Sequence, residues 1–413
     1  MKPRVAVLCA IPGLGGAELS LLEVISRLRD RYEFHLLIPG EGRLKEAAEA
    51  AGAKTRILAW PEALSRTGET AMRAGPAKLL LALAGLWSFT RDLSRVLEEI
   101  DPAVFVTNAV KAHMAGALAR RRKDVPLVWY MRDGLEGRRL SRKLLRMLSR
   151  RCDLAICVSQ YVLAQFRQYV SSAVAAHVVY DPVDLNRFHP AVKAAGDLHK
   201  QSDEVWFGIV GPITPLKGHD VFLEAAEKAA EQLPNAVFVI VGNNPYFTEA
   251  GLRYEELLQR RSATRLGGRV KFLGFRQDVP AVLSQVDVLV QPNRGPEGLG
   301  RSLLEAMACG VPVITVDRWG PAELVQHGET GLLFRPLDAD ELARHMVTLG
   351  HDEGLRRFMG KLGRDWMQEN FVSNKLAGQV DQVLTSVIAS QLQEAVDEDF
   401  ATGEVLLPGS RGN

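Results

Sequence analysis

Two carboxylates, Glu297 and Glu305, flank a glycine-rich stretch of the chain. Each carboxylate offers two acceptor oxygens, so each can bind a pair of hydroxyls on a sugar or a ribose. Between them, Gly298 and Gly300 let a ligand approach the backbone closely. A diphosphate that carries a polyol at each end needs this order of groups: acid, amides, acid. The alternative is a solvated helix with ordinary surface acids.

The stretch is expected to open a helix from about Leu299 to Cys309, directly after an apolar strand that ends at Gln291. Gly310 predicts the helix end. Free amides at a helix N-terminus, aligned with the helix dipole, form an anion site. The amides at this N-terminus belong to Leu299, Gly300 and Arg301.

Two other strand-to-helix turns carry residues of interest. Lys217 follows the apolar run Trp206–Val210, and taken alone it is best interpreted as a solvated loop lysine. In the first half of the chain, Gly15 and Gly16 follow the run Val5–Cys9 and open a helix. The dinucleotide-binding fingerprint is not met there, because the third glycine and the ribose-binding acid are missing.

The composition is that of a soluble globular protein with two domains. The chain has 413 residues, of which 47% are hydrophobic and 24% charged, too many for one comfortable core. A net charge of +2 argues neither for nor against a polyanionic partner, and we expect no nucleic acid. The four scattered cysteines have no histidine at metal-ligand spacing, so we expect reduced thiols. No Asp-x-Asp pattern lies in a suitable loop, and no metal or cofactor is expected.

The elements that must position these residues alternate along the whole chain. Short apolar runs joined by helical patterns predict parallel sheets covered on both faces. Helices are expected at Ala17–Leu28, His113–Arg122 and Arg138–Arg151. The expected strands are Val5–Cys9, Phe34–Ile38, Thr55–Leu58, Val104–Thr107, Leu127–Tyr130, Leu154–Val158, Val178–Tyr180, Trp206–Val210, Val237–Val241, Val270–Phe272, Val288–Gln291, Val313–Val316 and Gly331–Phe334.

This pattern predicts two Rossmann-like, doubly wound α/β domains that face each other across a cleft. We expect an N-terminal domain at 1–190, a polar linker at 191–204 and a C-terminal domain at 205–365. A helix at 366–390 is expected to pack back toward the N-terminal domain, and 391–413 to be a disordered tail.

Several motifs together resemble the family 4 retaining glycosyltransferases, which have the GT-B fold. The Glu297–Glu305 stretch resembles the family's E-x7-E motif, and the segment 210–218 resembles its Gly-Arg…Lys-Gly loop. The resemblance covers most of the chain, and it implies that the domain at 1–190 binds the acceptor and the domain at 205–365 the nucleotide sugar. Its further parts are the segments 239–245, 270–275, 321–325 and 328–333.

The resemblance implies a role for each matching residue. Lys217 would contact the donor diphosphate, Glu297 the transferred sugar and Glu305 the ribose. Gly16, with Gly15, would approach the donor phosphates from the N-terminal domain. The remaining implied donor-binding positions are Gly242, the backbone near Arg276, Gly298, Leu299 and Gly300.

The chain departs from the family pattern at two places. Pro212 stands where the family usually has an arginine of the diphosphate clamp, and Arg301 could replace that cation. Arg132 and Asp133 follow the strand Leu127–Tyr130, where many members carry a histidine that touches the donor sugar. Arginine cannot act as a base, so Asp133 is the candidate that orients an acceptor hydroxyl. His113 either faces the cleft or has a capping or buried-core role.

The function implied is transfer of a sugar from a UDP- or GDP-linked donor to an acceptor hydroxyl with retention of configuration. Cell-envelope polysaccharide, lipopolysaccharide or glycolipid synthesis would supply the carbohydrate or lipid-linked acceptor. A sugar-nucleotide epimerase or hydrolase on the same fold is the alternative. A non-catalytic two-domain binding protein is opposed by the absence of a signal sequence, and an NAD-dependent oxidoreductase by the failed fingerprint.

The segment 138–151 contains seven cations and no acid. Its leucines form an apolar stripe, and a basic amphipathic helix can dock on anionic lipid. A helix packed on the sheet with a solvated basic face is the alternative. The best candidate for a membrane span, Leu79–Trp87, is well short of the ~20 residues that crossing a bilayer requires. We therefore expect a cytoplasmic protein, with a peripheral position at the inner membrane face if the basic helix binds lipid.

Overall fold

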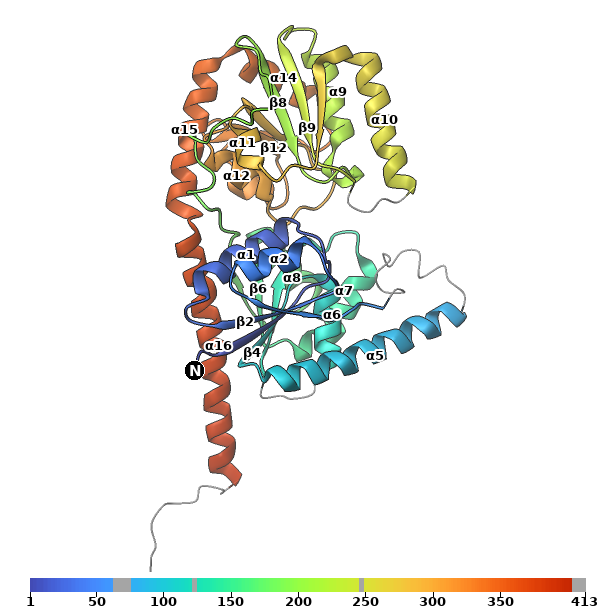
Figure 1. Cartoon of the computed structure of the whole chain (residues 1–413), viewed down its shortest axis with the longest axis vertical. Helices are drawn as coiled ribbons and strands as arrows, with labels where there is room; N and C mark the ends of the chain where they lie inside the picture. The colour runs from blue at the N-terminus through green and yellow to red at the C-terminus, as the bar shows by residue number, and fades with distance from the viewer. Residues whose placement is uncertain (62–75, 121–124, 245–248, 403–413) are drawn as a thin grey trace, which may run out of the picture.

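The computed structural model describes residues 1–61, 76–120, 125–244 and 249–402. It consists of two α/β domains stacked one above the other, joined along one side by two long helices at the C-terminal end of the chain (Figure 1). Each domain is built on a wholly parallel sheet. The predicted fold class, with two Rossmann-like domains, is confirmed.

The N-terminal sheet has seven strands among the described residues, in the order β3-β2-β1-β4-β5-β6-β7. The order reverses between the neighbours β1 and β4, and ligands of open α/β sheets bind beyond the carboxyl ends of the strands at such a point. The strands are β1 (Arg4–Leu8), β2 (Glu33–Ile38), β3 (Lys54–Ile57), β4 (Val104–Thr107), β5 (Leu127–Met131), β6 (Leu154–Cys157) and β7 (Ala175–Val178).

The C-terminal sheet repeats this plan with six strands in the described part of the chain, in the order β10-β9-β8-β11-β12-β13. Here the order reverses between β8 and β11. The strands are β8 (Val205–Val210), β9 (Ala236–Val241), β10 (Val270–Gly274), β11 (Val288–Gln291), β12 (Val313–Val316) and β13 (Gly331–Phe334).

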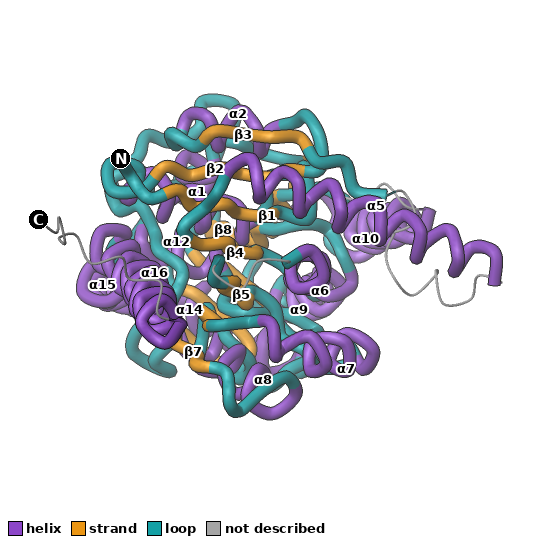
Figure 2. Tube along the Cα trace, turned by 90° about the horizontal axis from the view of Figure 1, so that it is seen from below, coloured by secondary structure: helices purple, strands orange, loops and turns teal. Residues whose placement is uncertain are grey.

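Helices cover both faces of the sheets, since the crossovers between parallel strands are helical. In the N-terminal domain α5, α6 and α7 follow one another on one face, while α1 and the C-terminal α16 pack together on the other (Figure 2). The helices of this domain are α1 (Gly16–Leu28), α2 (Arg43–Ala50), α5 (Pro76–Ile100), α6 (Val110–Ala119), α7 (Arg139–Leu148) and α8 (Gln160–Tyr169). The later helices are α9 (His219–Ala229), α10 (Glu249–Arg265), α11 (Val279–Leu283), α12 (Arg301–Ala308), α13 (Pro321–Leu324), α14 (Ala339–His351), α15 (Glu353–Asn370) and α16 (Ser373–Thr402).

Continuously apolar strands supply the core of each domain. Trp129 of β5 and Trp206 of β8 are both fully buried, which explains why these strands read as apolar runs rather than as alternating patterns. Every strand expected from the sequence is present, with ends displaced by at most two residues. The exception is β7, which ends at Val178 where the predicted strand begins.

The chain passes between the domains twice. The segment between β7 and β8 has neither helix nor strand, and its Lys200 ammonium pairs with Asp287 of the C-terminal domain. On the return, α15 ends at Asn370 and α16 begins at Ser373. The predicted helix boundary at 366 therefore falls inside α15, and helix α16 continues past 390 to Thr402, so the tail expected from 391 begins as helix. Residues 403–413 lie outside the described residues.

Candidate active site

The loop that leads into α12, residues 292–300, lies at the carboxyl end of β11, beside the switch point of the C-terminal sheet. Side chains at both ends of the loop fix its shape. Gln291 donates from Nε2 to Asn293 Oδ1 at 2.7 Å and accepts from the Ser302 hydroxyl at 2.8 Å. Gly300 is the N-cap with φ 106°, a left-handed conformation that favours glycine. We call residues 292–300 the donor loop.

Lys217, in the turn after β8, contacts Glu297, in the loop after the neighbouring strand β11. The Lys217 ammonium donates to Glu297 Oε2, which also accepts from Asn293 Nδ2 at 3.1 Å. About a quarter of each charged side chain is exposed, 26% for Lys217 and 23% for Glu297. The pair is thus a reachable cation and carboxylate side by side, an arrangement that can bind a phosphate and a hydroxyl in adjacent places.

Arg301 and Glu305 form a second pair on α12. Arg301 Nε donates to Glu305 Oε1 at 2.8 Å, and its Nη1 donates to the Ser20 hydroxyl of the N-terminal domain, also at 2.8 Å. Glu305 is buried, which raises the pKa of its carboxyl, while Arg301 and Arg187 act in the opposite direction. Arg301 therefore lies between the domains and connects α12 to α1.

The glycine turn of the N-terminal domain lies against this arginine. A Cβ added at Gly16 would lie 3.4 Å from the Cβ of Arg301, so the two residues are already in contact. The neighbouring Gly15 amide donates to Glu18 Oε2 at 3.3 Å. Burial raises the pKa of the Glu18 carboxyl. Both switch points, one from each sheet, thus face a common site.

Gly298 brings the donor loop against the other side of the N-terminal domain. A Cβ added there would lie 1.9 Å from the carbonyl oxygen of Arg132, closer than any real contact. The Gly298 carbonyl accepts a hydrogen bond from the Ser159 hydroxyl at 2.7 Å. Only glycine fits at this position, because the two domains meet there backbone to backbone.

Arg132 itself is buried in the N-terminal domain. Its guanidinium forms an ion pair with Asp181, donates from Nε to Asn108 Oδ1 at 2.8 Å, and stacks 3.7 Å above the Tyr130 ring. The Arg132 Nη2 and the Asn108 Nδ2 are buried without a hydrogen-bond partner in the described structure. They are free donors at the carboxyl end of the N-terminal sheet.

Known proteins resemble the chain over nearly its whole length. The family model for Glycosyl transferases group 1 matches residues 193–366, and the model for Glycosyltransferase Family 4 matches residues 14–187. A GDP-mannose-dependent monoacylated alpha-(1-6)-phosphatidylinositol monomannoside mannosyltransferase of Corynebacterium glutamicum is 30% identical over 311 residues, which are 70% of this chain and 77% of that protein. The chain belongs to the family 4 glycosyltransferases.

Solved structures agree with this assignment. The structure of HepE from Anabaena in complex with UDP and glucose has a TM-score of 0.78 and 25% identity, and covers 93% of this chain and 100% of that one. Sucrose-phosphate synthase from Thermosynechococcus elongatus has a TM-score of 0.79 at 22% identity, covering 94% and 100% of the two chains. The fold is therefore GT-B, and the chain is a glycosyltransferase that uses a nucleotide-sugar donor.

His113 is not at the surface of this glycosyltransferase's cleft. It is fully buried, hydrogen-bonded through Nδ1 to the Thr107 hydroxyl at 2.7 Å and stacked on Trp129. Helix α6 begins three residues earlier than predicted, at Val110, so His113 points into the core instead of capping the helix. Of the roles left open for His113, the buried one describes its position, and its inclusion among the catalytic candidates needs correction.

The burial of His113 predicts a pH-dependent stability. Burial lowers the pKa of His113 to about 3, and Arg132 acts in the same direction. Unfolded histidine has a pKa of about 6.5. Between these values only the unfolded state takes up the proton, so this group makes the free energy of unfolding fall as the pH drops, by about 1.4 kcal/mol per pH unit. Urea unfolding of His113→Gln from pH 4 to 5.5 should show a slope shallower than wild type by about that amount; equal slopes would refute the burial argument.

Three other predicted positions have partners that bear on their roles. Asp133 is partly exposed and pairs with Arg138 at 3.4 Å. The Arg276 side chain is held by Asp197 and Asp278, which leaves only its backbone for a base. A Cβ at Gly242 would lie 1.9 Å from the Gly211 carbonyl oxygen, so Gly242 is required for packing between two loops of the C-terminal domain.

Helix α12 also begins later than expected. Helix α12 spans Arg301–Ala308, and the predicted first residue, Leu299, lies in the donor loop with its side chain buried. The free amides at 299–301 are therefore those of the loop end, the N-cap and the first helical residue. They still lie at the N-terminal end of α12, where the partial positive charge of the helix dipole is greatest.

Sequence reasoning missed several residues that complete the site. Ser20, Asn108 and Asp181 have no motif that marks them, because their partners lie far away in the chain. Glu18 could have been found, since an acid three residues after Gly15 matches the capping pattern at a helix start. Glu323 stood in the closing segment without an assigned role.

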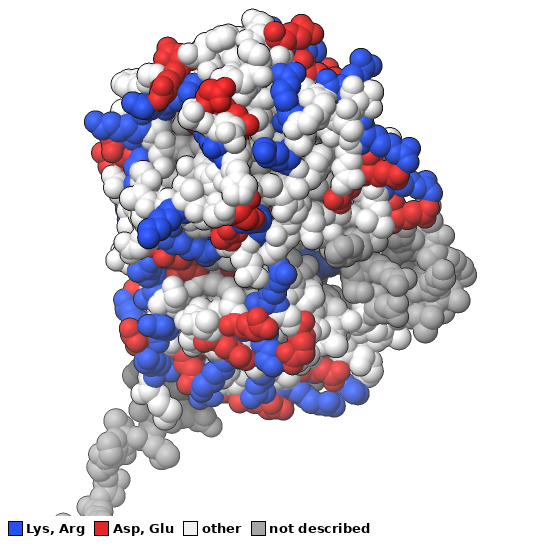
Figure 3. Space-filling model, turned by 45° about the horizontal axis from the view of Figure 1, so that its top comes forward, with Lys and Arg blue, Asp and Glu red and all other residues white. Residues whose placement is uncertain are grey.

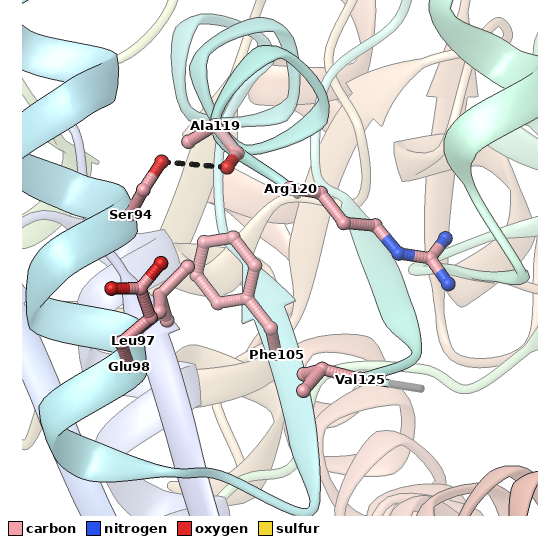
Figure 4. A pocket seen from close by; sticks show the side chains of 7 residues that line it. All are labelled: Ser94, Leu97, Glu98, Phe105, Ala119, Arg120 and Val125. Carbon is pink, nitrogen blue, oxygen red and sulfur yellow. Dashed lines mark hydrogen bonds between the residues drawn. The ribbon is translucent and has the colours of Figure 1, made fainter. Parts of the chain in front are cut away.

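Other surfaces carry less information. A small hollow between α5, β4 and α6 is lined by Ser94, Leu97, Glu98, Phe105, Ala119, Arg120 and Val125, none of which is a predicted site residue (Figure 4). Acidic and basic side chains are interspersed over the face shown in Figure 3. Among the described residues, no three His, Cys, Asp or Glu side chains form a metal-binding group, and no helix is long and apolar enough to cross a membrane.

Proposed function

We propose that the chain transfers a hexose from a nucleotide-diphosphate donor to a hydroxyl of a lipid-linked or carbohydrate acceptor, with retention of configuration. The observation that supports this most is the meeting of two cation–carboxylate pairs beside the switch point of the C-terminal sheet, where the glycine turn of the N-terminal domain contacts one of them. One pair is Lys217 with Glu297, and the other is Arg301 with Glu305, which Gly16 contacts from the N-terminal domain.

Each pair contains one group for the leaving diphosphate and one for a polyol. Lys217, Arg301 and the amides at 299–301 would neutralise the charge that develops on the diphosphate, which is usually the largest catalytic contribution. Glu297 would accept hydrogen bonds from the transferred sugar, and Glu305 from the ribose diol. In this proposal Arg301 supplies the cation that the family usually has at the position of Pro212.

Retention would proceed by attack from the face of the leaving group. The acceptor oxygen forms a bond to the anomeric carbon as the bond from that carbon to the phosphate oxygen breaks, and the acceptor's proton passes to the departing phosphate. Positive character at the anomeric carbon is balanced by the adjacent diphosphate. Asp133, which is partly exposed, would orient the acceptor hydroxyl, and we expect no metal requirement.

The relatives support the proposed classes of donor and acceptor. The Corynebacterium glutamicum relative is named for GDP-mannose and a phosphatidylinositol mannoside, and HepE was solved with UDP and glucose. The test is a panel of GDP- and UDP-linked hexoses, with and without lipid-linked acceptors and with EDTA. Product with the anomeric configuration of the donor supports the proposal. Free sugar alone would favour a hydrolase, and no turnover of any donor would reject the transfer reaction.

We propose that helix α7 binds an anionic membrane surface. Lys143 and Arg146 are exposed and have no carboxylate partner among the described residues, and Met147 beside them is 66% exposed. Of the other cations on this segment, Arg142 stacks on Tyr169 and Arg138 pairs with Asp133. A basic helix with an exposed apolar side chain suits a lipid-linked acceptor held at the inner face of the membrane.

The lipid proposal predicts a charge-dependent affinity. Each near-surface cation contributes about 1 kcal/mol to binding of anionic lipid. The double variant Lys143→Ala with Arg146→Ala should therefore have about 30-fold lower affinity for phosphatidylglycerol vesicles at low salt, measured by co-sedimentation. The matched control removes two exposed arginines of α10, Arg253 and Arg260, and should bind as wild type does. Absence of wild-type binding, or equal loss in the control, would reject α7 as the docking surface.

A further inference from the structure

Glu323 of α13 reaches from the C-terminal domain to the N-terminus of α8 in the other domain. Its two carboxylate oxygens accept hydrogen bonds from the amides of Gln160, at 2.8 Å, and Tyr161, at 2.6 Å. The Tyr180 hydroxyl donates to the same carboxylate at 3.0 Å. Amides in the first turn of a helix have no partner within the helix, and the helix dipole favours a negative charge there. Glu323 therefore caps a helix of the opposite domain.

A second contact between the domains lies four residues earlier. Trp319 donates from Nε1 to Glu136 Oε2 at 3.3 Å, and Arg318 lies 3.6 Å from the same oxygen. Trp319 has φ 62°, a left-handed conformation that is costly for a bulky side chain and persists only where its surroundings enforce it. The segment 318–323, with its partners on the N-terminal domain, is called the clasp below.

The clasp is tied to the donor loop by the backbone. The Gly320 amide donates to the Glu297 carbonyl oxygen at 3.1 Å. A Cβ at Gly320 would lie 1.8 Å from the Gly298 carbonyl oxygen, so the backbones of the clasp and the donor loop are in contact. That carbonyl also accepts the Ser159 hydroxyl, which caps α8 by accepting from the Val162 amide at 3.1 Å. The donor loop is thus held between the same two elements that the clasp joins.

Every hydrogen bond that the Glu323 side chain makes among the described residues goes to the other domain. A carboxylate kept for the stability of its own domain would have partners within it. We propose that Glu323 is a positioning residue, which holds the domains closed and thereby orders the Glu297–Gly298 part of the donor loop for the donor sugar. This inference rests on the proposed role of that loop in donor binding.

The test compares Glu323→Ala with Glu329→Ala, which removes an exposed glutamate of the same domain that has no side-chain partner among the described residues. Small-angle X-ray scattering of the ligand-free chain should give a larger radius of gyration for Glu323→Ala alone. Because misplacement of reacting groups by about 1 Å can cost 10²-fold in rate, its kcat/KM for the nucleotide sugar should fall about 10- to 100-fold, with a melting temperature close to that of the control.

Glu136→Ala removes the partner of Trp319 and Arg318 on the N-terminal domain. It tests the proposal if Glu323→Ala does not fold. It should shift both measurements in the same direction. Variants that match Glu329→Ala in radius and in kcat/KM overturn the proposal, as does a change in only one of the two. A radius of gyration of the wild-type chain larger than that of the closed structure also overturns it. Absence of turnover by wild type with every donor would instead reject the proposed function and leave the scattering comparison valid.

Discussion

Lys217→Ala is expected to lower kcat by about 10²- to 10³-fold, a loss of about 3 kcal/mol of transition-state stabilisation. The Lys217 ammonium is partly exposed and its only partner among the described residues is Glu297. In the proposed site, its removal would leave a carboxylate beside the diphosphate where a cation stood. Two effects then add, because the leaving group loses a counter-charge and gains a repulsive neighbour. Steady-state rates with a saturating donor measure the loss.

A control lysine separates this effect from a general loss of charge. Lys361 is exposed on α15 in the same domain, and Lys361→Ala should turn over as wild type does. Lys217→Arg should recover part of the rate, since the cation is retained but not its compact ammonium geometry. Near-normal turnover in Lys217→Ala would remove Lys217 from the diphosphate site.

Arg132→Met is expected to destabilise the N-terminal domain by about 3–5 kcal/mol, since it leaves the buried Asp181 without its cation. The side chains of both residues are almost inaccessible, with 5% and 10% of their area exposed. An uncompensated buried charge costs far more than an exposed one. Urea unfolding followed by far-UV circular dichroism measures the change.

The partner substitution shows whether the ion pair is the cause. Arg132→Met combined with Asp181→Leu removes both charges, and apolar replacements of a buried pair are often neutral or stabilising. The double variant should therefore regain most of the lost stability. If it is as unstable as Arg132→Met alone, the loss comes from the contacts of Arg132 with Asn108 and Tyr130 and the ion-pair account fails.

The fold was predictable because its signals are local. Continuously apolar runs such as Val288–Gln291 predicted buried parallel strands, and the glycines at 15, 16, 298 and 300 predicted turns at the carboxyl ends of these strands. Errors in boundaries arose where local patterns are weak. The start of α12 moved to Arg301 because Gly300, in a left-handed conformation, serves as its N-cap.

The half of the site that belongs to one motif could also be predicted from the sequence. Glu297, Arg301 and Glu305 lie within a few residues of one another, so their order could be read directly. The contacts between domains could not, because they join residues more than a hundred positions apart, such as Arg301 with Ser20 and Glu323 with Gln160. His113 illustrates the same limit, since only the packing of Trp129 against it reveals its burial.

A crystal structure of the chain with GDP or UDP bound tests the donor site most directly. The account predicts the diphosphate within hydrogen-bonding distance of Lys217 Nζ and the amides at 299–301, with the ribose diol on the Glu305 carboxylate. Arg301 would remain between the domains, near Gly16. A nucleotide bound elsewhere, with the Lys217–Glu297 and Arg301–Glu305 pairs untouched, would contradict the assignment of this site.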